Sequence, residues 1–374
     1  MKNLIRIGIF IGCLFFSTGR GMAQDVRNPA TPRHGEWSFA PHLEWETDHA
    51  GDDILVDIGA IRIHEQGRIF VMNTRINRVH VFDLQGGHLF SFARKGEGPG
   101  EIKEAFDLFL ADDRVIVPDM NRIHYFSVKG EFLKSVRTTE MFLPYFFLDE
   151  HRMLGYPFSH LRRETRTVFL YDLTSKQKQE VVEIPAVKPL RYSGNGMRLM
   201  LRMPFEVSEE LVIVKNSGDL WYGYADTYRI QRLGVSGKNR SAFSLDGRER
   251  ETLSVPDKLK VFDRFADNLQ EIPRNILNEI AEQLPDQAPF FHRIFCDAAN
   301  RFYVMTAGIK RSHVVGVDIF SSQGKYLYRG HIDLEPGCFW NKMAMKDHHL
   351  VVFIEDRDGE KKLVAYTLNL PEAS

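Results

Sequence analysis

Apolar strand-like segments alternate with polar turns along most of the chain, and the alternation repeats. Residues 68–92, RIFVMNTRINRVHVFDLQGGHLFSF, indicate an apolar strand, a polar turn, a second apolar strand that ends at Phe82, a glycine turn and a third strand. Residues 114–136, RVIVPDMNRIHYFSVKGEFLKSV, repeat this order, with Phe126 in the matching place. A long repeat of this kind in β-type sequence is typical of the blades of a β-propeller.

Four further copies of the pattern follow, and the chain ends soon after the last one. They cover residues 168–184, 227–245, 314–332 and 349–370. Each copy carries one large apolar residue on the strand that we expect to be third in its blade, and these residues are Phe82, Phe126, Tyr171, Leu233, Phe320 and Tyr366. We therefore predict an all-β fold, a six-bladed β-propeller that residues 24–374 form as a single domain.

The sixth copy lacks an outer strand, and an unassigned segment near the start of the chain could supply it. Residues 36–46, EWSFAPHLEWE, are strand-like and belong to none of the six copies. We expect this segment to act as a closing strand in the last blade. Closure of the ring in this way would remove a sheet edge that could otherwise pair with other chains.

Two insertions interrupt the repeat. Residues 186–205 are basic and loop-like, and they contain a Gly-Asn-Gly turn. Within residues 247–285, apolar side chains recur at helical spacing from residue 255 onward, and Pro273 is placed to open a second helix. We predict a helical hairpin between the fourth and fifth blades that covers one face of the ring.

The composition fits a β-rich protein and argues against one class of partner. Phe and Gly each occur 28 times, which suits a chain with many strands and many turns. The formal net charge is −1, with the charges well mixed along the sequence. Nucleic-acid-binding proteins usually carry a concentrated basic surface, so we predict no nucleic-acid partner.

The first 23 residues have the features of a signal peptide. A basic start is followed by an apolar run at residues 7–16 and by small residues up to Ala23, the expected cleavage site. The run is shorter than the roughly 20 residues of a membrane span, and no later segment qualifies as a span. We expect a protein exported to the periplasm or the cell exterior. Lipid attachment at Cys13 is the less favoured alternative, because Cys13 lies inside the apolar run.

Two cysteines, Cys296 and Cys338, remain in the mature chain. An exported protein can oxidise such a pair to a disulfide. The alternative, which we favour, is that both serve as small buried hydrophobic residues.

One stretch resembles a known family. Residues 67–102, GRIFVMNTRINRVHVFDLQGGHLFSFARKGEGPGEI, are similar to six-bladed β-propeller proteins exported by Bacteroidota and related bacteria, which are relatives of NHL and TolB-like propellers. The GEGPGE motif is the most specific mark of this family, and residues 42–61 resemble its entry segment. The resemblance extends from about Leu43 onward. It implies the propeller fold and export, and it implies no particular reaction.

The glycine-rich motif invites comparison with phosphate-binding loops. A dinucleotide-binding loop needs a third glycine where this chain has Glu101, and a P-loop needs a lysine after the glycines, whereas Lys95 precedes them. We interpret the motif as a crossing between blades, in which the glycines supply positive φ angles and Pro99 stiffens the turn. Arg94 and Glu101 remain candidates for contact with a ligand.

Metal binding has weak support in the sequence. His80 and His124 hold matching places in the first two copies and could converge on a metal, but packing between blades is the favoured interpretation. Residues 355–362, EDRDGEKK, resemble part of a calcium loop, and we favour a hairpin turn there. We predict no cofactor and assign no metal ligand, although a divalent metal remains an alternative.

The leading functional prediction is a binding or interaction module that uses the ring face lined by the insertions. Arg191, Arg198 and Arg202 are the best candidates to bind an acidic or sugar-like ligand, because the repeat itself does not require their insertion. The partner would be a protein or a glycan. The alternative is an enzyme of the lyase or hydrolase type with a metal or polar cluster at the axial channel. The common nucleophile and metal motifs are absent from the sequence, so we favour a non-enzymatic function.

Overall fold

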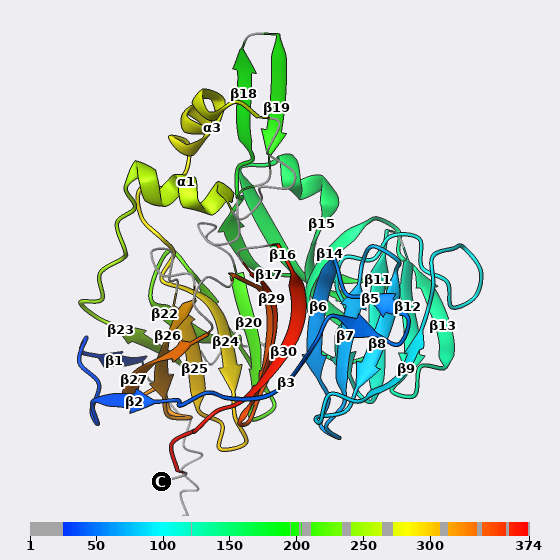
Figure 1. Cartoon of the computed structure of the whole chain (residues 1–374), viewed down its shortest axis with the longest axis horizontal. Coiled ribbons are helices and arrows are strands. Elements are labelled where there is room, and N and C mark those ends of the chain that lie inside the picture. The colour runs from blue at the N-terminus through cyan, green and yellow to red at the C-terminus, as the bar shows by residue number, and fades with distance from the viewer. Residues whose placement is uncertain are drawn as a thin grey trace, which may run out of the picture.

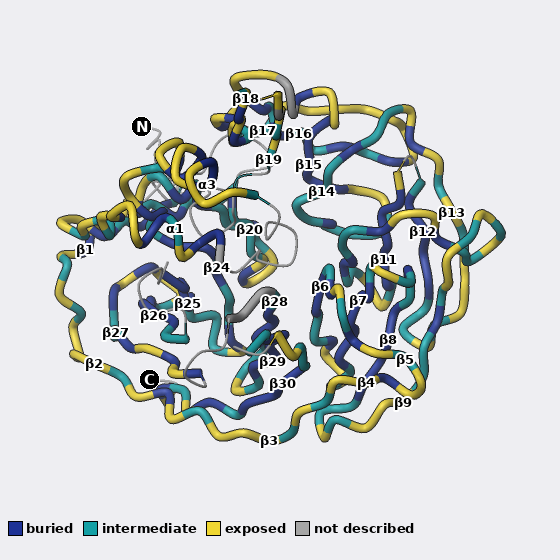
Figure 2. Tube along the Cα trace, turned by 45° about the horizontal axis from the view of Figure 1, so that its top comes forward, coloured by how far each residue is buried: buried dark blue, intermediate teal, exposed yellow. Residues whose placement is uncertain are grey.

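Six antiparallel sheets follow one another around a common centre (Figures 1 and 2). The first strands of neighbouring sheets contact one another, so these strands line the centre and the later strands of each sheet lie progressively farther out. The structure is a computed structural model, and it describes residues 25–120, 122–194, 196–201, 203, 211–233, 241–263, 272–306, 313–334, 339–356 and 359–372.

The first three sheets are formed by consecutive strands. The first blade contains β6 (Ile58–Ile63), β7 (Ile69–Asn73), β8 (Arg78–Phe82) and β9 (His88–Phe92). The second contains β10 (Phe109–Ala111), β11 (Arg114–Asp119), β12 (Arg122–Ser127) and β13 (Phe132–Arg137). The third contains β14 (Phe142–Phe147), β15 (Arg152–Pro157), β16 (Thr165–Asp172) and β17 (Lys178–Pro185).

The last three sheets each combine strands from the C-terminal half of the chain with one strand from its start. The fourth blade contains β20 (Leu211–Asn216), β21 (Asp219–Tyr224), β22 (Arg229–Leu233) and β23 (Ala242–Leu245). The fifth contains β24 (Phe291–Cys296), β25 (Phe302–Thr306), β26 (Val314–Phe320) and β27 (Tyr326–Asp333). The sixth contains β28 (Phe339–Lys346), β29 (His349–Glu355) and β30 (Lys361–Thr367).

An N-terminal strap, residues 25–47, runs along the outside of these last three blades (Figure 2). Its strand β1 (Asp25–Asn28) pairs in parallel with β23, and β2 (Glu36–Ser38) pairs in parallel with β27. Its strand β3 (His42–Thr47) pairs antiparallel with β30 and is the outermost strand of the sixth blade. A short hairpin of β4 (His49–Ala50) and β5 (Asp53–Ile54) leads from the strap into the first blade.

The hydrophobic core is divided among the junctions between blades. Six clusters of buried side chains each combine residues from two neighbouring blades, including the junction between the sixth and the first. The six large apolar residues predicted for the third strands do lie on third strands. The prediction of an all-β, six-bladed β-propeller is therefore confirmed.

Helical structure within the described residues is limited to two α-helices and one short 3-10 turn. Helices α1 (Val255–Asp263) and α3 (Arg274–Ala281) lie between β23 and β24, and the turn η1 spans Phe158–Arg162. The predicted helical hairpin is not confirmed as one unit, because residues 264–271 between the two helices lie outside the described residues. The first insertion, residues 186–205, contains a β-hairpin, β18 (Leu190–Gly194) and β19 (Met197–Leu201), where a loop was expected.

Several predictions concern residues outside the described ranges. The signal peptide predicted for residues 1–23, the alternative lipid site at Cys13, and Cys338 all lie there, so they stay predictions. Cys296 is a free, partly buried cysteine, and burial raises the pKa of its thiol. In the part of the chain that the structure describes, no helix is long and apolar enough to cross a membrane.

Candidate functional site

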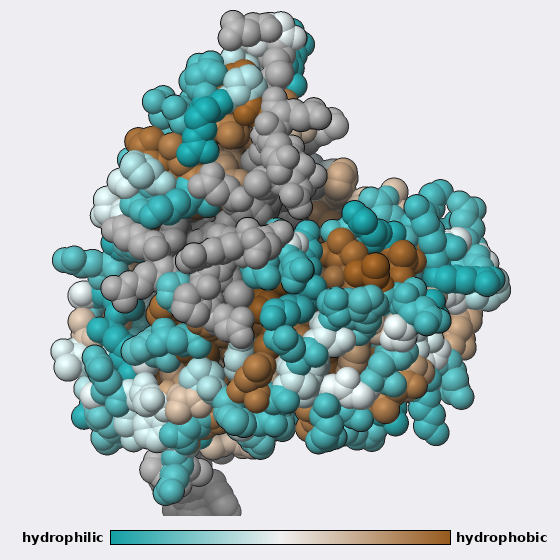
Figure 3. All heavy atoms as spheres, viewed as in Figure 1, coloured by the Kyte–Doolittle hydropathy of each residue, from teal (hydrophilic) through white to brown (hydrophobic). Residues whose placement is uncertain are grey.

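The two insertions meet in a cap that projects from the ring (Figures 1 and 3). We use the name cap for β18, β19, α1, α3 and the segments that flank the two helices, residues 252–254 and 282–288. Helix α3 contacts both α1 and β18. The cap has its own hydrophobic cluster, which includes Leu190 and Tyr192 of the hairpin and Phe262, Ile276 and Ile280 of the helices. Two segments that are far apart in sequence therefore form one packed unit.

The hairpin of the cap has one buried and one exposed face. Its cross-strand pairs alternate, so that Leu190–Leu201 and Tyr192–Leu199 face the helices, while Arg191–Met200 and Ser193–Arg198 face outward. The outward side chains are exposed, and Met200 is 71% accessible. The fold thus brings together two of the predicted ligand-binding residues, Arg191 and Arg198, on one outward surface. Arg202 lies outside the described residues.

The hairpin is held against the helical part of the cap by a pair of backbone contacts. The Arg191 amide N–H donates to Oε1 of Gln283 at 3.0 Å, and Nε2 of Gln283 donates to the carbonyl oxygen of Arg191 at 2.7 Å. These bonds use the backbone of Arg191, which leaves its guanidinium group in solvent. The outward arginines are therefore carried by a fixed strand.

The helical segment is closed at its base by short-range pairing between its two ends. The Ala288 N–H donates to the carbonyl of Glu251, and the Leu253 N–H donates to the carbonyl of Asp286, both at 2.8 Å. Helix α1 begins with a capping arrangement in which Ser254 Oγ lies 2.5 Å from Asp257 Oδ2. The cap is consequently attached to the ring through residues 247–251 and 289–290, which we call the neck.

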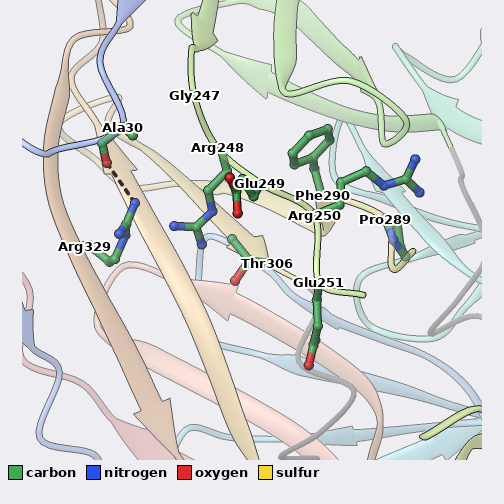
Figure 4. Close-up of a pocket in the computed structure, with 10 residues that line it drawn as sticks. All are labelled: Ala30, Gly247, Arg248, Glu249, Arg250, Glu251, Pro289, Phe290, Thr306 and Arg329. Atoms are coloured by element: carbon green, nitrogen blue, oxygen red, sulfur yellow. Dashed lines mark hydrogen bonds between the residues drawn. The ribbon is translucent and has the colours of Figure 1, made fainter. Parts of the chain in front are cut away.

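A polar pocket of about 390 Å³ lies between this neck, the strap and the fifth blade (Figure 4). Its lining includes Arg248 and Glu249 from the neck, Thr306 from β25 and Arg329 from β27. Figure 4 shows the side chains of Arg248, Thr306 and Arg329 on one side of the pocket and Arg250 turned away from them. Arg250 is bonded instead to the carbonyl of Ala288 at 2.7 Å.

A fully buried carboxylate, Asp318, stands behind the two pocket arginines. It accepts hydrogen bonds from the hydroxyl groups of Tyr228 at 2.8 Å and Tyr326 at 2.5 Å. Arg329 Nε lies 3.3 Å from one of its oxygens, and Arg248 Nη2 lies 3.8 Å from the other. Burial, and then the nearby Asp318 charge, raise the pKa of both tyrosines, so the two hydroxyl groups remain donors. This network could not be recognised from the sequence, because its members come from β26, β27, the turn before β22 and the neck.

The GEGPGE loop of the first blade is bonded to itself. Glu101 accepts hydrogen bonds from the Gly98 N–H at 2.9 Å and from Arg94 Nε at 2.8 Å. These bonds, that of Gly98 first, lower the pKa of the Glu101 carboxyl. A β-carbon on Gly96 would lie 2.1 Å from Oε2 of Glu101, so the glycine makes room for this carboxylate. The expectation that the glycines supply positive φ is met at Gly100, with φ +77°, and not at the other two.

Arg94 and Glu101 are thus placed apart from the other predicted residues. Their loop belongs to the first two blades, on the opposite side of the molecule from the cap (Figure 1). The two side chains contact each other, and Glu101 also caps the turn.

The matching histidines bond within their own blades. His80 Nδ1 lies 2.8 Å from Ser91 Oγ, and His124 Nδ1 lies 2.9 Å from Ser135 Oγ. In each case the serine is the residue directly opposite on the outermost strand. His124 also lies 3.3 Å from the buried carboxylate of Asp119. The two histidines therefore connect third and fourth strands.

The acidic segment at residues 355–362 has the contacts of a turn. Asp356 Oδ1 accepts the Glu360 N–H at 2.9 Å, and Gly359 has φ +81°, as in a hairpin turn. Among the described residues, no group of three or more His, Cys, Asp and Glu side chains is arranged to hold a metal ion. Asp358 lies outside those residues.

The chain was compared with known families. Residues 46–204 match the family DUF5128, which is described as a 6-bladed beta-propeller. The chain is a six-bladed β-propeller similar to this family. The propeller described here therefore has the resemblance that its GEGPGE motif predicted, and the match includes the motif itself. No curated protein matches the chain.

Two of the solved structures that are similar to this propeller come from Bacteroides species. A Bacteroides fragilis protein classed as exported aligns with a TM-score of 0.53 and 13% identity, covering 93% of this chain and 100% of that one. A member of the DUF4221 family from Bacteroides vulgatus aligns with a TM-score of 0.58 and 10% identity, covering 90% and 99%. Virginiamycin B lyase from Staphylococcus aureus aligns at 0.41 and 11%, covering 87% and 99%, a likeness too low to support any functional argument. The two Bacteroides structures support the fold.

Proposed function

We propose that this propeller is an exported binding module whose cap holds an acidic glycan. The observation that carries the proposal is the outward face of the β18–β19 hairpin, where Arg191 and Arg198 are exposed on a strand pair that is packed against helices. The insertion at residues 186–205 contains Lys and Arg residues and no Asp or Glu. Within this insertion the cationic side chains have no acidic counterpart.

The chemistry of this face suits a chain of carboxylated sugars. Guanidinium groups form bidentate hydrogen bonds with carboxylates. A pre-formed hairpin also loses little conformational entropy when it binds. The exposed Met200 side chain adds an apolar surface between the charges. A similarity to a protein classed as exported supports the expected location outside the cytoplasm.

The two other candidate ligand-binding residues, Arg94 and Glu101, are better explained by their own loop. Arg94 and Glu101 contact each other, which supports a role in shaping their own loop. No observation on the described residues favours the alternative of a lyase or hydrolase.

Binding to the carboxylated polysaccharide alginate, with neutral dextran as comparison, tests the proposal. We expect affinity for alginate alone, which weakens as salt is added. The double variant Arg191→Glu with Arg198→Glu should bind at least about tenfold more weakly. A variant with the same change in charge, Arg27→Glu with Lys129→Glu, serves as control because both residues are exposed outside the cap. Equal loss in the two variants, or equal binding of dextran, would refute the proposal.

A further inference from the structure

Three arginines and two glutamates line the pocket at the neck of the cap, and one buried carboxylate stands behind two of the arginines. Asp318 is fully buried and is already bonded to Tyr228, Tyr326 and Arg329. Arg248 approaches it only to 3.8 Å, which exceeds a hydrogen-bond length. One aspartate thus faces two arginines. The N–H donors of Arg248 have fewer hydrogen-bond partners among the described residues than those of Arg329.

The other described charged groups near Arg248 do not accept hydrogen bonds from its guanidinium group. No described residue accepts a hydrogen bond from the Arg248 side chain, and no ion pair joins Glu249 to an arginine among the described residues. Arg329 is bonded to the Ala30 carbonyl at 2.9 Å as well as to Asp318, so it is fixed in place. Arg248 is therefore the arginine best placed to donate into the pocket (Figure 4).

A hydroxyl group lies beside these arginines. Thr306 is on β25, directly opposite Gly316 of β26. A β-carbon on Gly316 would lie 2.3 Å from Thr306 Oγ1, so the glycine leaves space for this hydroxyl. The pocket thus offers a guanidinium donor, a hydroxyl and the exposed Glu249 carboxylate within one cavity. Donors and acceptors in this combination suit a ligand that carries both a carboxylate and hydroxyl groups.

We propose that this pocket is a second binding site, which takes a single carboxylated sugar unit. Its carboxylate accepts hydrogen bonds from Arg248, and its hydroxyl groups bond to Thr306 and Glu249. The volume of about 390 Å³ is at the lower end of the range for small-molecule sites, which fits one sugar ring. That the ligand is a sugar rests on the proposed function of the cap. That it carries an anionic group rests on Arg248 in the pocket and does not depend on the cap.

Calorimetric titration of the full protein with sodium glucuronate tests the site, with glucose and sodium acetate as comparison ligands. We expect a dissociation constant on the order of 1 mM for glucuronate. Glucose, which lacks the carboxylate, and acetate, which lacks the hydroxyl groups, should each bind at least about tenfold more weakly. No measurable binding of glucuronate, or equal binding of acetate, would overturn the proposal.

Substitutions of the pocket residues test whether glucuronate binds in the pocket. Arg248→Gln should weaken glucuronate binding at least about tenfold, because a charge-assisted bond is lost. If Arg248→Gln fails to fold, the pair Thr306→Val and Thr306→Ser decides: the valine should weaken binding several-fold and the serine should not. Unchanged affinity in both Arg248→Gln and Thr306→Val would place the ligand elsewhere and overturn the site.

A further comparison separates this site from the cap. The variant Arg191→Glu with Arg198→Glu should bind glucuronate like the unmodified protein, because its changes lie on the outward hairpin face. Loss of alginate binding in that variant with intact glucuronate binding supports both proposals. Glucuronate binding without any alginate binding would refute the function proposed for the cap and leave the pocket in place.

Discussion

The two halves of the ring protect their outer strands in different ways. In the fourth, fifth and sixth blades, the N-terminal strap covers the sheet edge with β1, β2 and β3. In the first three blades, β9, β13 and β17 are the outermost strands, and no described strand pairs with their outer edge. The difference shows that one fold can protect a sheet edge either by adding a strand or by changing the residues on the edge itself.

Two of the three uncovered edges carry charged residues that discourage pairing with another chain. Strand β13 has the sequence FLKSVR, and β17 has KQEVVEIP, so both present charged side chains. Charged residues on an edge strand oppose the addition of a further strand. In the first two blades, the contacts His80–Ser91 and His124–Ser135 also attach the outermost strand to its neighbour.

The covered half depends on contacts over very long sequence separations. Asn28 of the strap donates to the carbonyls of Ser244 and Gly324 and accepts the Tyr326 N–H, so one side chain joins the fourth and fifth blades. At the other end of the strap, Trp45 Nε1 donates to the Leu84 carbonyl of the first blade at 2.8 Å. The strap therefore links four blades in series.

Removal of the strap is the change with the largest expected effect. A variant that lacks residues up to Thr47 should lose its cooperative, soluble fold, because three sheet edges and the buried Asn28 partners become exposed together. Thermal unfolding followed by circular dichroism measures the loss, and hydrogen exchange should rise first in β23, β27 and β30.

The matched control is a variant that begins at Asp25 and keeps the whole strap. It should unfold in a single cooperative transition. If the variant without residues 25–47 also melts cooperatively and at a similar temperature, the strap does not secure the covered half, and the comparison between the two halves fails.

The uncovered half should respond to pH through His80. Burial lowers the pKa of His80 to about 4, below its ordinary value of 6.5, and the side chain is 0% exposed. The unfolded chain therefore binds a proton between pH 6.5 and 4 that the folded chain does not, so stability present above pH 6.5 is lost as the pH falls. The loss should be about 2 kcal/mol at pH 5.

Denaturant unfolding of the unmodified protein and of His80→Gln, at pH 7.5 and pH 5, isolates this contribution. Burial also lowers the pKa of His160 and His349, so both proteins should weaken at low pH. The contribution of His80 is the difference between the two proteins in the free energy of unfolding lost from pH 7.5 to pH 5. Equal loss of stability in the two proteins would show that His80 does not make the first blade sensitive to acid.

The repeated blades of the ring could be predicted from the sequence more completely than the strap that pairs with them. The third strands could be recognised because each blade repeats a local order of strand, turn and large apolar residue, as at Phe82 and Phe126. The parallel pairing of β1 with β23 could not, because it joins residues more than two hundred positions apart without any repeat to reveal it.

The candidate site also has a part that the sequence indicated and a part that it did not. Arg191 and Arg198 could be singled out as candidates because their insertion departs from the repeat and contains no acidic residue. The Asp318 network could not be predicted, because Asp318 lies in an ordinary strand and its partners Tyr228 and Arg248 come from the fourth blade and the neck. Buried charge depends on tertiary contacts that a single sequence does not display.

The smallest expected effect tests the GEGPGE loop, which joins the first two blades in the uncovered half. Gly96→Ala should destabilise the fold by about 1 kcal/mol, because the added carbon would meet the Glu101 carboxylate that caps this turn. Since Gly96 does not have a positive φ, the cost should come from that contact and should largely disappear in a protein that also carries Glu101→Ala. Chemical unfolding of the two single variants and the double variant measures the coupling. Additive effects would mean that the glycine does not make room for Glu101, and the motif would then need another explanation than the closure of its own turn.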